Sequence, residues 1–134
     1  MQKDIEPVAL ARVLAGVLVR WLPVALLAAA IFLLSSVPSK ELPRFGSWDT
    51  LVKKGAHACG YGLLAAALWR GFGWDRKKWW LAFALAAAYA VTDELHQRIT
   101  PGRHSSAVDV GIDSIAAAAA IAICAIARAR RKPQ

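Results

Sequence analysis

The chain has 134 residues, enough for one domain. Hydrophobic residues make up 57% of it, charged residues only 19%, and the mean hydropathy is +0.41, which is unusual for a soluble domain, where roughly a quarter of the residues carry charge. The net charge of +8 is explained by basic residues that flank apolar segments, so we expect membrane lipids and no nucleic acid as partners.

Four long apolar segments follow one another along the chain. They cover residues 21–37, 56–74, 79–97 and 108–127, and the first could begin as early as residue 13. Each approaches the roughly 20 residues that a helix needs to cross a bilayer core of about 30 Å. Lipid offers no partners for backbone polar groups, and the connections are short. The sequence therefore predicts an all-α, integral membrane bundle of four antiparallel transmembrane helices.

The N-terminal part of the chain is open to two interpretations. Its apolar residues are interleaved with Arg12 and Arg20, which fits an amphipathic helix lying in the membrane interface. It fits equally well an extension of the first span whose basic side chains reach the surface. We therefore divide the chain into a cytoplasmic or interfacial segment (1–20), the four-helix membrane domain (21–127) and a basic cytoplasmic tail (128–134).

Lysine and arginine are distributed unequally between the two ends of the predicted bundle. One end would carry eleven of the 17, namely Lys3, Arg12, Arg20, Arg70, Arg76, Lys77, Lys78, Arg128, Arg130, Arg131 and Lys132. The other end would carry the remaining six, Lys40, Arg44, Lys53, Lys54, Arg98 and Arg103. The positive-inside rule places the richer end in the cytoplasm, together with both termini.

Acids, bases and amides gather at the outer end of the predicted spans. The second span begins with Lys54, His57 and Tyr61, and the third span ends with Asp93, Glu94 and Gln97. Arg103 lies in the loop that follows, and the fourth span begins with Asp109 and Asp113. Their helical spacing puts members of each group on one face. Ionisable groups in spans usually face the bundle interior and mark function. The alternative is an ion-pair brace, but buried ion pairs stabilise poorly, so we favour a functional site.

The same residues carry a family resemblance. The pieces are K-x-x-H-x-x-x-Y at 54–61, T-D-E-L-H-Q at 92–97, P-G-R at 101–103, D-V-G-I-D at 109–113, and the shorter S-S-V-P at 35–38. In this order they resemble the VanZ-like family over about residues 30–125. The chain departs from the family at Asp113, where the family commonly has Asn. The resemblance implies a multi-pass protein of the bacterial inner membrane, linked to resistance to the glycopeptide teicoplanin.

Three functions are compatible with these residues. The first is an enzyme that acts on a lipid-linked or cell-envelope substrate by acid–base chemistry. Its catalytic candidates are His57, Asp93, Glu94 and Asp109. Its substrate-binding candidates are Lys54, Tyr61, Gln97, Arg103 and Asp113. Among these, Arg103 is placed to grip a phosphate or carboxylate through two nitrogens. A divalent cation on Asp93, Asp109 and Asp113 is a weaker hypothesis. The second function is envelope binding without turnover, and the third, ranked last, is proton-coupled transport.

Overall fold

The computed structural model describes residues 7–131, and within that range the chain is helical and contains no strand. The expected all-α class is therefore confirmed. The helices are α1 (Pro7–Ser36), α2 (Asp49–Gly71), α3 (Trp79–Gln97) and α4 (Ala107–Arg130), and two 3₁₀ turns, η1 (Ser39–Glu41) and η2 (Gly46–Trp48), lie between α1 and α2. Residues 1–6 of the expected N-terminal segment and 132–134 of the expected tail lie outside the described range.

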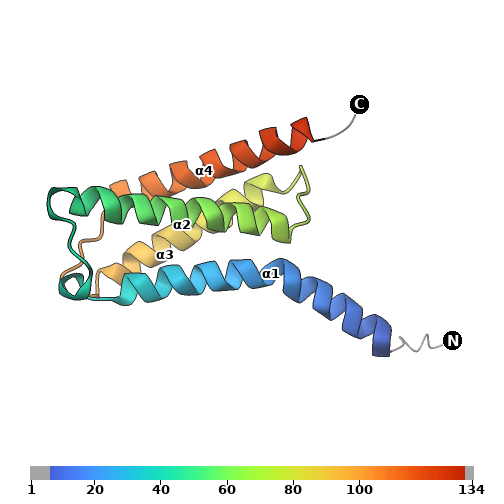
Figure 1. Ribbon diagram of the computed structural model, residues 1–134, viewed down its shortest axis with the longest axis horizontal. Helices are drawn as coiled ribbons and strands as arrows, with labels where there is room; N and C mark the ends of the chain where they lie inside the picture. Colours follow the sequence, from blue (N-terminus) through green and yellow to red (C-terminus); the bar gives the residue numbers. More distant parts are fainter. Residues whose placement is uncertain (1–6, 132–134) are drawn as a thin grey trace.

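Helix α1 joins the N-terminal part of the chain to the first apolar segment without a break. Residues 7–20 are an extension of this helix, which continues to Ser36. Pro23 lies inside α1 and removes one backbone donor, and such prolines bend helices. Figure 1 shows that α1 is bent and that its N-terminal part leaves the other helices.

The other helices follow the apolar segments with one notable difference. Helix α3 has the expected bounds, and α4 extends slightly past the expected segment to Arg130. Helix α2 begins at Asp49, well before the expected residue 56. Its additional turns carry Lys53 and Lys54, so these lysines project from a helix rather than from a loop.

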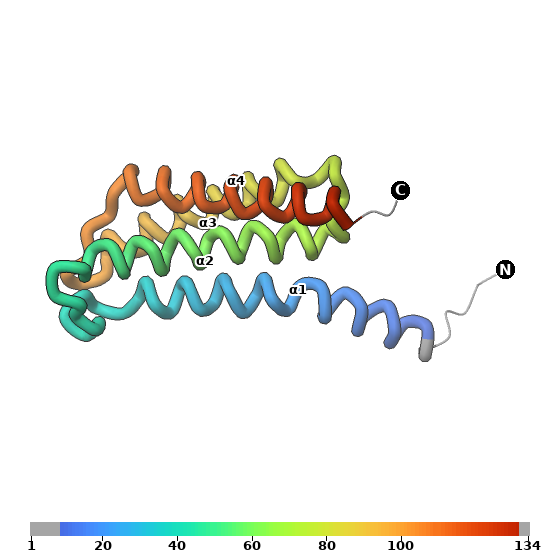
Figure 2. The backbone as a smooth tube through the Cα atoms, turned by 45° about the horizontal axis from the view of Figure 1, so that its top comes forward, coloured from blue at the N-terminus to red at the C-terminus, as the bar shows by residue number. Residues whose placement is uncertain are grey.

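The four helices run side by side, and α2 contacts the other three (Figures 1 and 2). The α1–α2 and α3–α4 connections meet at one end of the bundle. The α2–α3 connection lies at the other end, with the C-terminal end of α4. The short loops therefore join antiparallel neighbours, as predicted.

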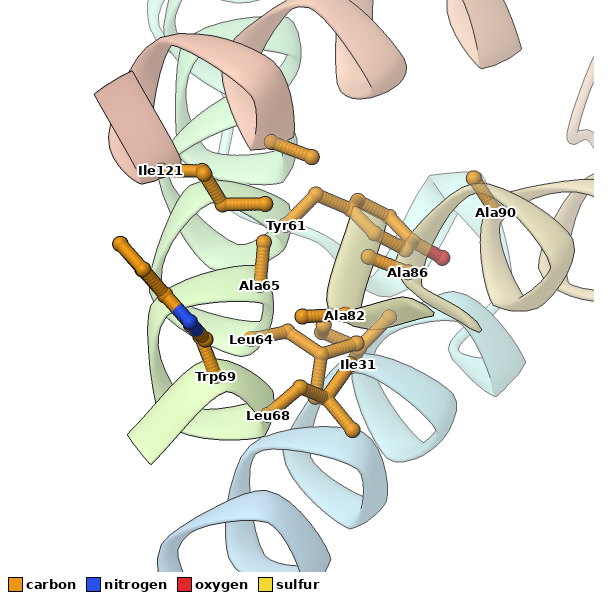
Figure 3. Packing of buried hydrophobic residues seen from close by; sticks show 11 residues of the cluster. Ile31, Tyr61, Leu64, Ala65, Leu68, Trp69, Ala82, Ala86, Ala90 and Ile121 are labelled. Carbon is orange, nitrogen blue, oxygen red and sulfur yellow. The ribbon is translucent and has the colours of Figure 1, made fainter. Parts of the chain in front are cut away.

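Small residues allow the helices to approach closely. Ala82, Ala86 and Ala90 form one buried stripe of α3, and Figure 3 shows the Tyr61 ring of α2 projecting toward two of them. At Gly62 an added Cβ would lie 3.4 Å from a backbone oxygen of α4. Small residues of α3 and α4 thus let these helices pack closely on α2.

The polarity of the bundle is inverted relative to a soluble protein. Leu18 and Ile115 are 67% and 72% exposed, whereas Asp93 and Asp113 are 4% and 3% exposed. Helices α1 and α4 are long and apolar enough to cross a membrane by length and composition. Apolar side chains on the outside and carboxylates on the inside fit a protein whose solvent is lipid.

Candidate functional site

A polar pocket of about 170 Å³ opens at the end of the bundle where the two loops meet. Seven of the nine predicted site residues line it, namely Lys54, His57, Glu94, Gln97, Arg103, Asp109 and Asp113. Sequence analysis had not assigned the other lining residues to the site: Ser39, Lys53, Gly102, His104 and Ile112. The remaining two predicted residues, Tyr61 and Asp93, are buried and lie next to His57. The structure therefore brings together the residues that the motifs selected.

His57 lies between two buried carboxylates. Its Nδ1 atom is 3.9 Å from Oδ2 of Asp93 on α3 and 3.9 Å from Oδ2 of Asp113 on α4. These separations are too long for hydrogen bonds, but they place the ring between two buried acids. His57 also reaches the pocket, so it is positioned to exchange a proton with a bound molecule.

Asp93 is held from two further directions. Its Oδ2 accepts hydrogen bonds from Ser35 Oγ of α1 at 2.9 Å and from Gln97 Nε2 at 3.1 Å. Its Oδ1 and the Tyr61 hydroxyl are buried without a hydrogen-bond partner within residues 7–131. A buried polar group without a partner costs about 1–3 kcal/mol of stability. A cluster that served only to hold the helices together would not be expected to keep two such groups. Sequence analysis did not assign Ser35 to the site, although it belongs to the S-S-V-P piece of the resemblance.

Two ion pairs extend along the outer side of α2. Lys54 pairs with Asp109 and so links α2 to α4. Lys53 pairs with Asp49 at 2.7 Å on the same helix. The Lys54 side chain is 41% exposed, and exposed pairs of this kind contribute little stability, typically below about 1 kcal/mol.

Glu94 holds the beginning of α4. Its Oε2 accepts a hydrogen bond from the backbone N–H of Ser106 at 2.9 Å. The Ser106 hydroxyl accepts from the Val108 N–H and caps the helix. A carboxylate at this position is also favoured by the helix dipole. Glu94 therefore has a structural task, in addition to the acid–base role that the sequence suggested.

Arg103 holds the end of α1. Its Nε and Nη2 donate to the carbonyls of Val37 at 3.2 Å and Leu34 at 2.6 Å, which lie just beyond the end of α1 and in its last turn. Gly102 makes this possible because it has a φ of +72° and approaches Ser39 so closely that an added Cβ would lie 3.2 Å from the serine Cβ. The edge of Arg103 that would grip a phosphate bidentately is thus already engaged.

The carboxylates do not gather into a metal site. Within residues 7–131 no group of three histidine, cysteine, aspartate or glutamate side chains is arranged to hold a metal ion. Asp109 instead pairs with Lys54, and Asp93 is occupied by Ser35 and Gln97. The expected cation on Asp93, Asp109 and Asp113 therefore has no preformed ligand set in residues 7–131.

Two apolar helices, an inverted polarity and a pocket of ionisable groups define a small helical membrane protein. The chain belongs to the VanZ/LLP1 family, whose model matches residues 19–128 and so includes every candidate site residue. The resemblance drawn from the motifs is therefore confirmed. No curated protein and no solved structure matches the chain.

Proposed function

We propose that this chain is a multi-pass protein of the bacterial inner membrane whose polar pocket faces outward and takes the anionic headgroup of a lipid-linked or cell-envelope substrate. We propose further that this activity is linked to glycopeptide (teicoplanin) resistance, as membership of the family suggests. The observation that carries the proposal is the His57 ring, which lies between the buried carboxylates Asp93 and Asp113 and also reaches the pocket.

Four spans agree with the helix lengths. Helices α2 and α3 have 23 and 19 residues, or about 35 and about 29 Å at the rise of an α-helix, close to the roughly 30 Å of a bilayer core. They carry five of the twelve residues that line the pocket, Lys53, Lys54, His57, Glu94 and Gln97. Their outer faces still present Leu63, Leu85 and Leu95.

The orientation follows from the basic residues. The α2–α3 connection contributes Arg76, Lys77 and Lys78, and the adjacent end of α4 contributes Arg128 and Arg130. The positive-inside rule favours this end in the cytoplasm, with both termini. The pocket then lies at the level of the outer leaflet.

An anionic ligand suits the basic residues around the pocket. Lys53, Lys54 and Arg103 line it together with the carboxylates of Glu94, Asp109 and Asp113. Because Lys54 is partly exposed, its ammonium is able to exchange Asp109 for a ligand oxygen. The volume of about 170 Å³ is below the roughly 300–1,000 Å³ of sites that enclose a whole small molecule. A headgroup would therefore enter the pocket while the lipid part stays in the bilayer.

Within this site His57 is the group placed for proton transfer, and Asp93, whose Oδ2 lies 3.9 Å from the His57 Nδ1, orients it. A second candidate function is binding without turnover, as an envelope accessory protein. It is favoured by the observation that Glu94 and Arg103 each hold a helix end and so have tasks other than chemistry.

The experiment compares the same substitution at two histidines. His57→Gln keeps a polar side chain but removes proton transfer, whereas His96→Gln changes a residue outside the pocket that stacks on Phe32. We expect teicoplanin tolerance of cells that express His57→Gln to fall to the level without the protein, and His96→Gln to retain it. Equal amounts of both variants must be found in the membrane. Undiminished tolerance with His57→Gln, or a loss that only follows the amount of folded protein, would overturn the proposal.

A further inference from the structure

A second and larger concavity lies at the opposite end of the bundle from the polar pocket. This groove has a volume of about 950 Å³ and is formed by the end of α2, the beginning of α3 and the end of α4. Its apolar walls include Trp69, Trp74, Trp79, Phe83 and Ile121. Nothing in the proposed function uses it.

The α4 side of the groove is open because its residues are small. Four alanines, Ala118, Ala122, Ala125 and Ala129, line it at spacings that place them on one face of the helix. The facing walls are aromatic. An alanine face opposite indole rings leaves a long apolar slot of the kind that an acyl chain fills.

Trp69 and Trp74 form an aromatic corner of the groove, which is held in place by several contacts. Trp74 has a φ of 59°, a conformation that costs a bulky residue about 1–3 kcal/mol and persists only where the surroundings impose it. Its ring packs edge-on against Trp69 at 5.4 Å, and the guanidinium of Arg128 lies 4.7 Å from its centroid. The indole of Trp69 donates to the carbonyl of Asp75 at 2.8 Å. The corner is thus formed before any ligand binds.

The charged lining of the groove has a single sign. It contains the arginines Arg76, Arg128 and Arg131 and no acidic residue. A second copy of this chain would bring the same basic end to the groove and would meet like charge. A ligand that combines an anionic group with a long apolar part complements both the arginines and the slot.

We propose that this groove binds a membrane phospholipid with an anionic headgroup. One acyl chain lies between the tryptophans and the alanine face of α4, and the phosphate lies beside the arginines. The inference rests on the proposed membrane placement, which puts this end at the cytoplasmic leaflet, but not on the chemistry of the outer pocket.

The test uses the full chain in vesicles of zwitterionic phosphatidylcholine, to which brominated phosphatidylglycerol is added, since bromine quenches the tryptophans it touches. We expect quenching at a low mole fraction, well above that of brominated phosphatidylcholine at the same fraction. Arg128→Gln should lower this preference by more than the roughly fivefold that one basic residue near an anionic surface contributes without a specific site. Arg130→Gln is the matched control, because it removes the same charge from the same helix end outside the groove.

The two arginine variants distinguish a specific lipid site from general attraction to an anionic surface. Equal loss in Arg128→Gln and Arg130→Gln would mean general surface attraction and would overturn the site. The absence of an anionic preference in the unchanged protein, or quenching that depends on the ratio of protein to lipid as in self-association, would overturn it too. Brominated phosphatidylcholine in excess separately reports insertion, so its failure to quench would refute the membrane placement and with it the proposed function.

Discussion

The hydroxyl of Ser35 donates a hydrogen bond of 2.9 Å to Oδ2 of Asp93, 58 residues away in the sequence. The two residues join α1 to α3, and both are buried. Arg103 and Tyr89 provide further links to α1 by donating to its backbone carbonyls. Helix α1 is otherwise mostly exposed, so these few polar contacts fix the end of α1 that forms one side of the site.

Ser35→Ala should destabilise the bundle. A hydrogen bond to a charged group contributes about 1.5–3 kcal/mol, and its removal leaves Asp93 with one donor fewer in a buried place. Ser114→Ala is the control, because the Ser114 hydroxyl bonds only to the carbonyl of Val110 on its own helix. Thermal unfolding in detergent should show a lower midpoint for the first variant and little change for the second. Equal midpoints would show that the Ser35–Asp93 bond does not hold α1.

Gly62→Leu should separate α2 from α4. A side chain at this position meets the carbonyl of Ala116 and the methyl of Ala120, and overpacking of this kind costs about 1–3 kcal/mol. Gly111→Leu is the counterpart on α4, where an added Cβ meets nothing within 4 Å. The helix propensity of leucine should leave this second variant as stable as the parent or more so. Size-exclusion profiles and unfolding midpoints measure the contrast, and a Gly62→Leu protein of unchanged stability would refute close α2–α4 packing.

The bounds of the helices were predictable where apolar character changes sharply. Helix α3 begins at a pair of tryptophans after three charged residues, and its expected range of 79–97 is the observed one. The apolar segment was expected to start at residue 56 because Lys53 and Lys54 interrupt it, although the spacing of Lys54 and His57 already indicated a helical turn there. Each lysine has a carboxylate partner in the fold, and such pairing cannot be inferred from hydropathy.

The composition of the site was predictable to a similar degree. Helical spacing placed His57 with Lys54, and Asp109 with Asp113, and these four residues line one pocket. The partners within the site were less accessible to sequence reasoning. Arg103 was expected to grip a ligand, but it holds the end of α1. The sequence did not indicate this role, because the side chain that donates to the carbonyls at a helix end is set by contacts between distant parts of the chain.

The proposed topology is testable by cysteine labelling. In a background with Cys59→Ser and Cys124→Ser, Lys40→Cys marks the α1–α2 connection and Lys77→Cys the α2–α3 connection, and both lysines are exposed. A membrane-impermeant thiol reagent added to intact cells should label residue 40 and spare residue 77 until the membrane is opened. The reverse pattern would place the polar pocket in the cytoplasm and exclude an outer-leaflet substrate.

The two acids beside His57 should not be equivalent. The resemblance implies Asn at position 113, and in the structure Asp113 adds a second buried carboxylate 3.9 Å from the ring. Asp113→Asn removes an ionisable group from a buried place but keeps the shape. We therefore expect unchanged teicoplanin tolerance and a stability that is equal to the parent or higher by on the order of 1 kcal/mol.

Asp93→Asn should behave in the opposite way. Oδ2 of Asp93 accepts from both Ser35 and Gln97. An amide that faces those two donors with its NH₂ group loses both hydrogen bonds, and one that keeps them places its NH₂ group at the Oδ1 position. The variant should lose tolerance while it still accumulates in the membrane, because it no longer orients His57 with a charge. Tolerance assays and membrane immunoblots of the two variants measure the difference. If Asp113→Asn loses tolerance as completely as Asp93→Asn at equal protein levels, the two carboxylates act as one unit, and a site centred on Asp93 alone is wrong.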